Sequence, residues 1–231
     1  MLSNRLCKGL LAMSLLFSAS FAAHADGGIA IGGTRVVYPA MKKEVGMSVR
    51  NTSDDTSFMI QSWVDSGGNK SQDFIVTPPL FVSGPRNENT LRIMYVGKPP
   101  REDQETLYYF NVKSIPSMNK KDIEGKNVLI LAGVTRVKLF LRPAGLKPAI
   151  EKAPEMLTFQ RQGNQIQAAN SSPYYITMAQ IKSGAWKADD TMVPPHGTAL
   201  IRAPGSPGNT ISFRTINDYG AVTPEVTMSV R

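Results

Sequence analysis

The residue types that most often do chemistry in proteins are scarce in this sequence. One cysteine, Cys7, and two histidines, His24 and His196, occur among 231 residues. There is no G-x-S-x-G elbow and no phosphate-binding or dinucleotide-binding glycine loop. A metal site built on several imidazoles is excluded. The sequence therefore predicts no enzyme, no metal site and no cofactor, and it predicts that His196, between Pro195 and Gly197, lies in a turn.

Residues 1–25 have the features of a secretory signal peptide. Arg5 and Lys8 precede an apolar run from Gly9 to Phe21, and Ala23-His24-Ala25 has the small-x-small form of a signal-peptidase site. The alternative is a membrane anchor, but the run is too short to span a bilayer and no later segment is apolar enough. We therefore expect cleavage before Asp26 and a periplasmic protein without membrane insertion.

Cleavage at this point changes what the chain can bind. It removes Cys7, which excludes disulfides and thiol catalysis, and it lowers the formal charge of +8 by two. The remaining basic residues are scattered, with no run longer than Lys42-Lys43 or Lys120-Lys121. The sequence thus predicts no nucleic-acid partner, and the charge is expected to aid solubility or to attract an acidic protein.

The sequence after residue 25 has the pattern of a β-protein. Short runs rich in Val, Ile, Thr, Tyr and Phe alternate with Gly, Pro, Asn and Ser, and no segment has a convincing helical period. The strands expected in the first half are Ile29–Val37, Val45–Arg50, Phe58–Val64, Asp73–Val76, Thr90–Val96, Thr106–Val112 and Val128–Leu141. Those expected in the second half are Leu157–Gln160, Gln165–Ala169, Tyr174–Ile181, Thr198–Ile201, Thr210–Thr215 and Glu225–Val230.

This strand pattern predicts an all-β fold of two immunoglobulin-like β-sandwich domains joined by a short hinge. Arg142-Pro143-Ala144-Gly145 interrupts the pattern, so we expect domains at 26–143 and 144–231. Trp63 and Trp186 are candidate core aromatics, and Arg161-Gln162-Gly163-Asn164 is a candidate four-residue hairpin loop.

The longest expected strand, Val128–Leu141, is unusual because its first half is apolar on both faces. Fourteen extended residues would reach about 46 Å, far beyond an ordinary strand. An apolar strand with an open edge invites pairing with another chain. The pattern leaves two interpretations open, namely a buried central strand and a strand that is exposed because it binds a partner.

Several segments resemble, in order, motifs of the periplasmic pilus-assembly chaperones of the chaperone–usher pathway. They are Thr34–Pro39, Thr77-Pro78-Pro79, Glu105–Val112 with Ile115-Pro116, Val137–Pro143, Asn170–Thr177 and Ile216–Gly220. Any one of them is weak, but together they span nearly all of the sequence after residue 25. The connection from Ser117 to Lys126 resembles that of the short-loop members.

The resemblance implies a non-enzymatic chaperone that binds and folds fimbrial (pilin) subunits and delivers them to an outer-membrane usher. Family members insert a long strand into a subunit that lacks its own last strand. The residues that correspond to the donor strand are Leu129, Leu131, Gly133 and Thr135. Alternation alone does not select this face over the opposite face, Val128, Ile130, Ala132 and Val134, because a one-residue slip exchanges them.

The resemblance also assigns roles to charged residues. Arg35 and Lys138 correspond to the basic residues that bind the subunit's C-terminal carboxylate. Glu105, Arg142 and Asp218 correspond to charges that tie the two domains together.

Two positions depart from the family pattern. Val82-Ser83 stands where most members have an arginine and an aliphatic residue, and Gly133 replaces a bulky donor side chain. At Gly133 we expect either a subunit pocket that is shallow or already filled, or a β-bulge that makes Val134 the donor.

Two alternatives to a chaperone remain. An exported carbohydrate-binding β-sandwich module is the first, although no acidic loop cluster resembles a calcium site. A hydrolase that uses paired carboxylates is the second, and nothing in the sequence argues for it.

Overall fold

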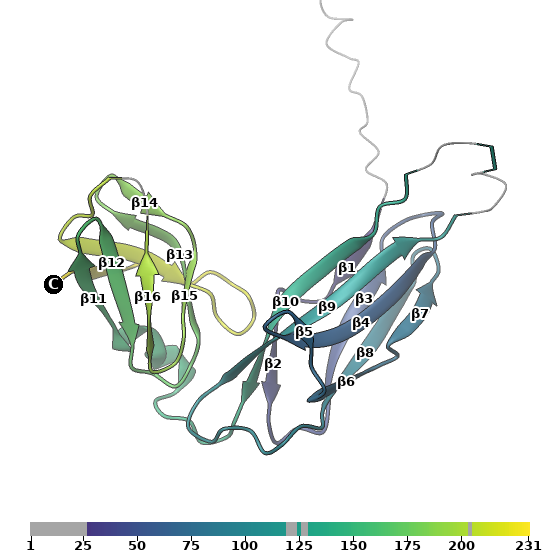
Figure 1. Ribbon diagram of the computed structural model, residues 1–231, viewed down its shortest axis with the longest axis horizontal. Coiled ribbons are helices and arrows are strands. Elements are labelled where there is room, and N and C mark those ends of the chain that lie inside the picture. Colours follow the sequence, from purple (N-terminus) through teal and green to yellow (C-terminus); the bar gives the residue numbers. More distant parts are fainter. Residues whose placement is uncertain (1–26, 119–123, 126–128, 203–204) are drawn as a thin grey trace, which may run out of the picture.

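Figure 1 shows a chain folded into two β-sandwiches, the first drawn in purple to teal and the second in green to yellow. The computed structural model describes residues 27–118, 124–125, 129–202 and 205–231. Within these residues the only helix is the 3₁₀ helix η1 (Ile150–Met156). The predicted all-β, two-sandwich fold is confirmed, whereas the expected signal peptide and most of the connection from Ser117 to Lys126 lie outside the described residues.

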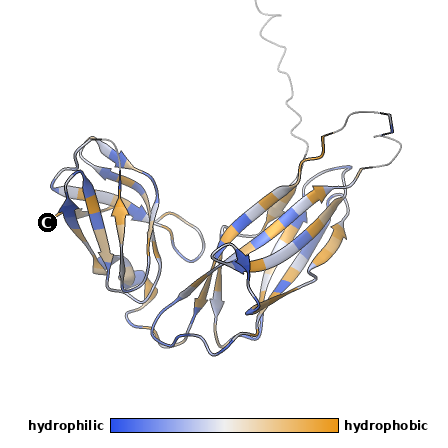
Figure 2. Ribbon diagram, in the orientation of Figure 1, coloured by the Kyte–Doolittle hydropathy of each residue, from blue (hydrophilic) through white to orange (hydrophobic). Residues whose placement is uncertain are grey.

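The first sandwich consists of two facing sheets. One has the order β1 (Ile29–Ile31), β3 (Val45–Asn51), β8 (Glu88–Tyr95) and β6 (Phe74–Thr77). The other has the order β2 (Arg35–Pro39), β10 (Gly133–Arg142), β9 (Thr106–Pro116), β4 (Phe58–Ser66) and β5 (Asn69–Lys70), and β7 (Leu80–Ser83) also pairs with β4. The alternation of apolar and polar residues along these strands, visible in Figure 2, buries one face of each sheet in a common core.

The first predicted strand, Ile29–Val37, is in fact two strands in different sheets. β1 pairs antiparallel with β3, and β2 pairs parallel with β10. The chain crosses between the sheets at Gly32-Gly33, where a side chain on Gly32 would collide with Ser48. Glycine permits this close approach, which alternation alone does not reveal.

Other details of the first sandwich also differ from expectation. β5 and β7 were not predicted, because one is very short and the other directly follows Pro78-Pro79. Trp63 is not a core residue, since it is only partly buried and lies outside the core cluster. Its pairing with Asn111 places it on the outer face of the sheet, whereas the adjacent Val64 is buried.

The second sandwich packs a three-stranded sheet against a five-stranded one. The first has the order β11 (Leu157–Gln162), β12 (Gln165–Asn170) and β16 (Gly197–Ile201). The second has the order β14 (Trp186–Ala188), β13 (Ile176–Ser183), β17 (Thr210–Thr215) and β18 (Val226–Ser229), with β15 (Thr191–Val193) also paired with β13. Its core contains Trp186, as predicted.

Two turns in the second sandwich test the local predictions. The hairpin between β11 and β12 has a two-residue loop, Gly163-Asn164, rather than the predicted four residues. Gly163 has a φ of 60°, which suits the tight turn and lets the strands continue further than their polar residues indicated. His196 lies in a turn with a φ of 49°, as predicted.

The long strand is shorter than predicted. β10 begins at Gly133, and residues 129–132 belong to no strand. The register from Gly133 paired with Ser114 to Leu141 paired with Thr106, if continued upstream, would place Leu131 opposite Pro116. Proline has no backbone N–H to donate, so the ladder loses a hydrogen bond at that point.

The segment before β10 is exposed, so the buried-central-strand interpretation is wrong for this half of the expected strand. It holds for the end of β10, where the strand lies between β2 and β9 and Leu139, Phe140 and Leu141 are buried. Leu129 is 82% exposed and Leu131 is 73% exposed. Figure 2 shows this apolar segment at the far end of the first sandwich, away from the second. These two leucines are exposed to water on a segment that pairs with no strand, so they are available to a partner.

Candidate functional site

The parallel pairing of β2 with β10 brings two basic residues side by side. Arg35 begins β2, Lys138 lies in the middle of β10, and the two are direct partners in the register. Within the described residues, β10 is covered by β2 only from Lys138 onwards, so its edge from Gly133 to Val137 is open. The two cations therefore mark the point where a covered strand edge becomes an open one.

Neither cation forms an ion pair among the described residues. Arg35 Nη1 donates to the carbonyl oxygen of Ile216 at 3.0 Å, while its Nε is buried without a partner. Lys138 Nζ donates to Thr177 Oγ1 at 3.3 Å. Both acceptors belong to the second sandwich, so the two cations bridge the sandwiches through neutral oxygens.

Burial and like charge act on the pKa of both groups. Burial lowers the pKa of Arg35, and the nearby carboxylates of Asp218 and Glu105 offset part of this change. Burial also lowers the pKa of Lys138, and repulsion from Arg35 adds to it. An anion placed between two such groups would relieve both effects.

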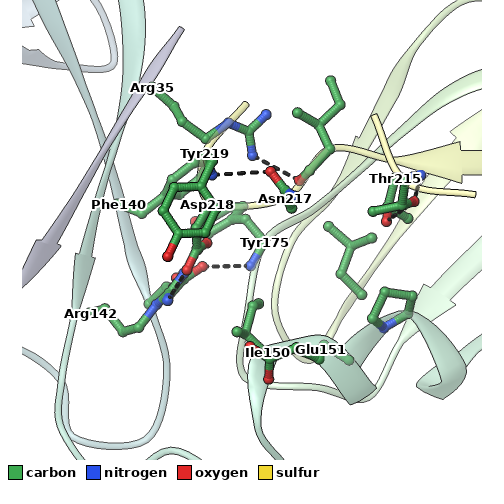
Figure 3. A pocket seen from close by; sticks show the side chains of 16 residues that line it. Arg35, Phe140, Arg142, Ile150, Glu151, Tyr175, Thr215, Asn217, Asp218 and Tyr219 are labelled. Atoms are coloured by element: carbon green, nitrogen blue, oxygen red, sulfur yellow. Dashed lines mark hydrogen bonds and ion pairs between the residues drawn. The ribbon is translucent and has the colours of Figure 1, made fainter. Parts of the chain in front are cut away.

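Arg35 borders a pocket of about 360 Å³ between the sandwiches, whereas Lys138 does not line it. Figure 3 shows Arg35, Phe140 and Arg142 on the first sandwich, facing the Asn217–Tyr219 turn of the second. The Arg35 guanidinium lies 5.7 Å from the centre of the Phe140 ring, and that ring lies 5.8 Å from the Tyr175 ring. Two aromatic side chains thus lie beside Arg35 at the edge of the pocket.

The three charges expected to tie the domains together lie in contact. Arg142 Nε donates to Glu105 Oε1 at 2.6 Å, and its two terminal nitrogens donate to the Asp218 carboxylate at 2.6 and 2.8 Å. The second oxygen of Glu105 accepts the backbone N–H of Tyr175 at 2.8 Å. Arg142 and Glu105 come from the first sandwich, and Asp218 and Tyr175 from the second.

Glu105 is 1% exposed, and this burial decides its electrostatics. Burial raises the pKa of Glu105, while the charge of Arg142 and the hydrogen bond from Tyr175 N–H act in the opposite direction. For Arg142, burial lowers the pKa, but the hydrogen bond to Asp218 and the charge of Glu105 outweigh it and raise the pKa above its ordinary value. The cluster is held by contacts across both sandwiches rather than by a surface ion pair.

The predicted donor residues divide into two groups. Gly133 and Thr135 lie in β10, paired with Ser114 and Val112. Leu129 and Leu131 lie in the exposed segment before the strand. The pairing is regular from Gly133 to the end of β10, so no β-bulge occurs at Gly133 in this structure.

The departure at Val82-Ser83 lies on β7. Val82 is 65% exposed, whereas Ser83 is buried, and its hydroxyl and carbonyl oxygens accept hydrogen bonds from Asn89 and Asn51. The outward-facing position where the resemblance leads us to expect an arginine is thus an exposed valine in this chain.

Sequence reasoning missed two groups of hydrogen-bonding partners, one at this site and one elsewhere in the first sandwich. One is the pair of acceptors, Thr177 Oγ1 and the Ile216 carbonyl, although each residue ends or begins a motif that resembles the family. The other is Asp65, which is buried and accepts hydrogen bonds from Arg136 and Asn111, each at 2.7 Å. No local pattern marks Asp65, because its partners come from strands that are distant in sequence.

The described residues contain no group of three or more His, Cys, Asp or Glu side chains that could hold a metal ion. Among the same residues, no helix has the length and apolar character needed to cross a bilayer.

The chain matches known families and structures over most of its length. Residues 28–147 match the family model described as "Pili and flagellar-assembly chaperone, PapD N-terminal domain", and residues 152–227 match "Pili assembly chaperone PapD, C-terminal domain". The chain is 45% identical over 216 residues to the probable fimbrial chaperone SfmC of Escherichia coli K12, covering 93% of each chain. It is 42% identical over 221 residues to the chaperone protein FimC of the same strain, covering 94% of this chain and 91% of the relative.

Solved structures show the same similarity. The periplasmic chaperone SfaE is 41% identical and aligns with a TM-score of 0.76 over 88% of this chain and all of that one. The Salmonella enterica SafA pilin–SafB chaperone complex aligns with a TM-score of 0.80 at 27% identity, over 87% of this chain and 96% of the matched chain. The chain therefore belongs to the family of PapD-like pili assembly chaperones, which are chaperones and not enzymes.

Proposed function

We propose that this chain binds a pilin subunit by strand addition along the open edge of β10 and anchors the subunit's C-terminal carboxylate on Arg35 and Lys138. The observation that carries the proposal is that these two cations, which form no ion pair among the described residues, lie at the point where β2 stops covering β10. A strand that paired with the open edge of β10, parallel to β10, would end beside Arg35 and Lys138. Its terminal carboxylate would accept charge-assisted hydrogen bonds and so fix the register.

The apolar segment before β10 supplies the side chains for this addition. Leu129 and Leu131, together with Gly133 and Thr135, would lie on the same side as the core-facing Val137 if the strand continued upstream. Entry into a subunit groove would bury leucines that are now exposed, worth about 1.5–3 kcal/mol for each side chain buried fully. Pairing with a subunit would also satisfy the open backbone edge.

The remaining roles follow from the family. The chaperone delivers its subunit to an outer-membrane usher and works in the periplasm after cleavage of residues 1–25. We place the domains at 26–143 and 144–231, and the two separate cores support this division, although the N-terminal family model extends to residue 147. Glu105, Arg142 and Asp218 hold these domains in the orientation that keeps the cations at the cleft.

The test is co-purification of a subunit from the periplasm. Native mass spectrometry of the wild-type chain should show a small β-rich partner in one-to-one stoichiometry, whereas a lone protein with affinity for sugar would favour a carbohydrate-binding module. Arg35→Ala and Lys138→Ala should each weaken the complex by about 2 kcal/mol or more, roughly thirtyfold. Arg50→Ala, on β3 in the opposite sheet, is the control.

Circular dichroism separates a lost anchor from a lost fold. Both cations are only partly buried and form no ion pair in the described chain, so the alanine variants should keep the wild-type spectrum. A folded Arg35→Ala or Lys138→Ala variant that retains its subunit at the wild-type level would disprove the carboxylate anchor.

A further inference from the structure

The second sandwich contributes to the basic site through two oxygen atoms. Thr177 Oγ1 accepts from Lys138 Nζ at 3.3 Å, and the Ile216 carbonyl accepts from Arg35 Nη1 at 3.0 Å. These acceptors are neighbours, because Ile216 N–H donates to the Thr177 carbonyl at 3.2 Å. One rigid part of the second sandwich therefore contacts both cations of the first.

We propose that Thr177 is a positioning residue of the carboxylate anchor, holding the Lys138 ammonium across the interdomain gap so that the anchor is assembled by both domains. This inference rests on the proposed function, because it needs a carboxylate to bind at Arg35 and Lys138.

The first argument is the placement of Thr177. Threonine is an ordinary strand residue, so its presence in β13 alone means nothing. Its neighbours Ile176 and Met178 face the core of the second sandwich, which directs Thr177 to the opposite face, toward the first sandwich. There it is 5% exposed, and among the described residues its hydroxyl is the hydrogen-bond partner of the Lys138 ammonium.

The second argument is electrostatic. Arg35 and Lys138 are adjacent on parallel strands, carry the same charge and form no ion pair in the described chain. Repulsion alone would drive the flexible lysine away from Arg35. A neutral oxygen can hold the ammonium without neutralising it, so the positive potential for an incoming anion is retained.

The third argument concerns entropy. A free lysine side chain loses rotamer freedom when it binds, and a lysine that is already held loses less. The Ile216 carbonyl does the same for Arg35. The Ile216 oxygen belongs to the backbone and cannot be removed by substitution, so Thr177 is the acceptor that a variant can test.

The experiment compares two synthetic peptides with the sequence of the last strand of the pilin that co-purifies with the wild-type chain. One carries a free C-terminal carboxylate and the other a C-terminal amide. Thr177→Val keeps the shape and removes the hydroxyl, and Thr177→Ser keeps the hydroxyl. Thr158→Val, at an exposed position of β11 in the other sheet, is the control. Calorimetry with the full mature chain measures the Kd of each pair.

Thr177→Val should weaken binding of the carboxylate peptide about tenfold or more, as expected for one hydrogen bond to a charged group. Thr177→Ser and Thr158→Val should bind like the wild type. The amide peptide should not distinguish Thr177→Val from the wild type. In a Lys138→Ala background, Thr177→Val should cause no further loss, because its effect acts through the lysine.

Three results would overturn the inference. They are an unchanged Kd for Thr177→Val, an equal loss with both peptides, and a loss that persists without Lys138. If Lys138→Ala weakens binding and Thr177→Val does not, the anchor stands and only the role of Thr177 fails. If the wild type binds acid and amide peptides equally, the carboxylate anchor itself is wrong, and the inference falls with it.

Discussion

Replacement of Arg142 by alanine tests how the two domains are held together. The substitution removes three hydrogen bonds, one to Glu105 and two to Asp218. The two carboxylates differ in their access to water, since the Asp218 side chain is 31% exposed and the Glu105 side chain is 1% exposed. The loss should therefore come mainly from Glu105, which is left as a buried charge.

The magnitude follows from that difference. Removing one partner of a buried ion pair lowers the free energy of unfolding by about 3–5 kcal/mol. Because Glu105 keeps the hydrogen bond from Tyr175 N–H, we expect the loss in Arg142→Ala to lie near the lower limit of this range. Asp218→Ala leaves Arg142 paired with Glu105 and should cost about 1 kcal/mol. Arg142→Lys keeps the charge but cannot form the same fork of hydrogen bonds, so we expect an intermediate loss.

Urea unfolding measures these losses, provided that each domain is followed separately. A Trp63→Phe background leaves Trp186, which is buried in the second sandwich, as the single tryptophan reporter. Far-ultraviolet circular dichroism reports both sandwiches. Arg142→Ala should destabilise the first sandwich and separate its transition from that of the second. A folded Arg142→Ala chain that loses less than about 1 kcal/mol would refute the view that Arg142 compensates a buried charge.

Three further predictions concern other parts of the chain. Burial raises the pKa of Asp65, but the hydrogen bonds from Arg136 and Asn111 outweigh this and lower the pKa below its ordinary 3.8. The stability that the Asp65 carboxylate contributes is therefore present above pH 3.8 and is lost as the pH falls through the lowered pKa. Urea titrations should show the stability gap between wild type and Asp65→Asn shrinking below pH 3.8. Gly133→Ile should weaken a subunit complex by about 1–3 kcal/mol if the subunit pocket that faces Gly133 is already filled. Tighter binding by this variant would mean that the pocket is open. If Val134→Ala weakens binding more than Gly133→Ile does, the strand has a β-bulge at Gly133 in the complex. N-terminal sequencing of periplasmic protein should begin at Asp26, and retention of residues 1–25 would contradict cleavage.

The sequence predicted the class of fold because β-alternation is a local property. Thr210–Thr215 was placed correctly because its polar and apolar residues alternate and its ends are marked by turn residues. The same reasoning joined β1 to β2, since alternation carries no information about which sheet a strand enters. The crossing at Gly32 depends on Ser48, which is a neighbour only in three dimensions.

The start of β10 could not be read from the sequence for a related reason. Leu129 and Leu131 have strand-like side chains, but a strand needs a partner with free backbone groups. The partner strand β9 ends at Pro116, and the composition of the apolar segment does not report this. The same residues that made the segment look like a buried strand are the ones that lie exposed.

The site residues were predictable only where a motif carried them. Arg35 and Lys138 were found through resemblance, because single basic residues on strands are usually solvated. Their oxygen partners on the second sandwich were not found, since a threonine hydroxyl and a backbone carbonyl have no signature of their own. Interactions between domains depend on the relative placement of two folds, which strand patterns do not encode.

The domain tie and the carboxylate anchor share one structural element. The turn after β17 contains Ile216, whose carbonyl oxygen contacts Arg35, and Asp218, whose carboxylate binds Arg142. Gly220 of the same turn lies against Thr34, so closely that a side chain there would collide with it. Any movement of this turn away from the first domain would therefore loosen the tie and release Arg35 at once. Asp218→Ala, although mild for stability, should for this reason weaken binding of the carboxylate peptide more than that of the amide peptide, and equal binding losses would show that the tie and the anchor are independent.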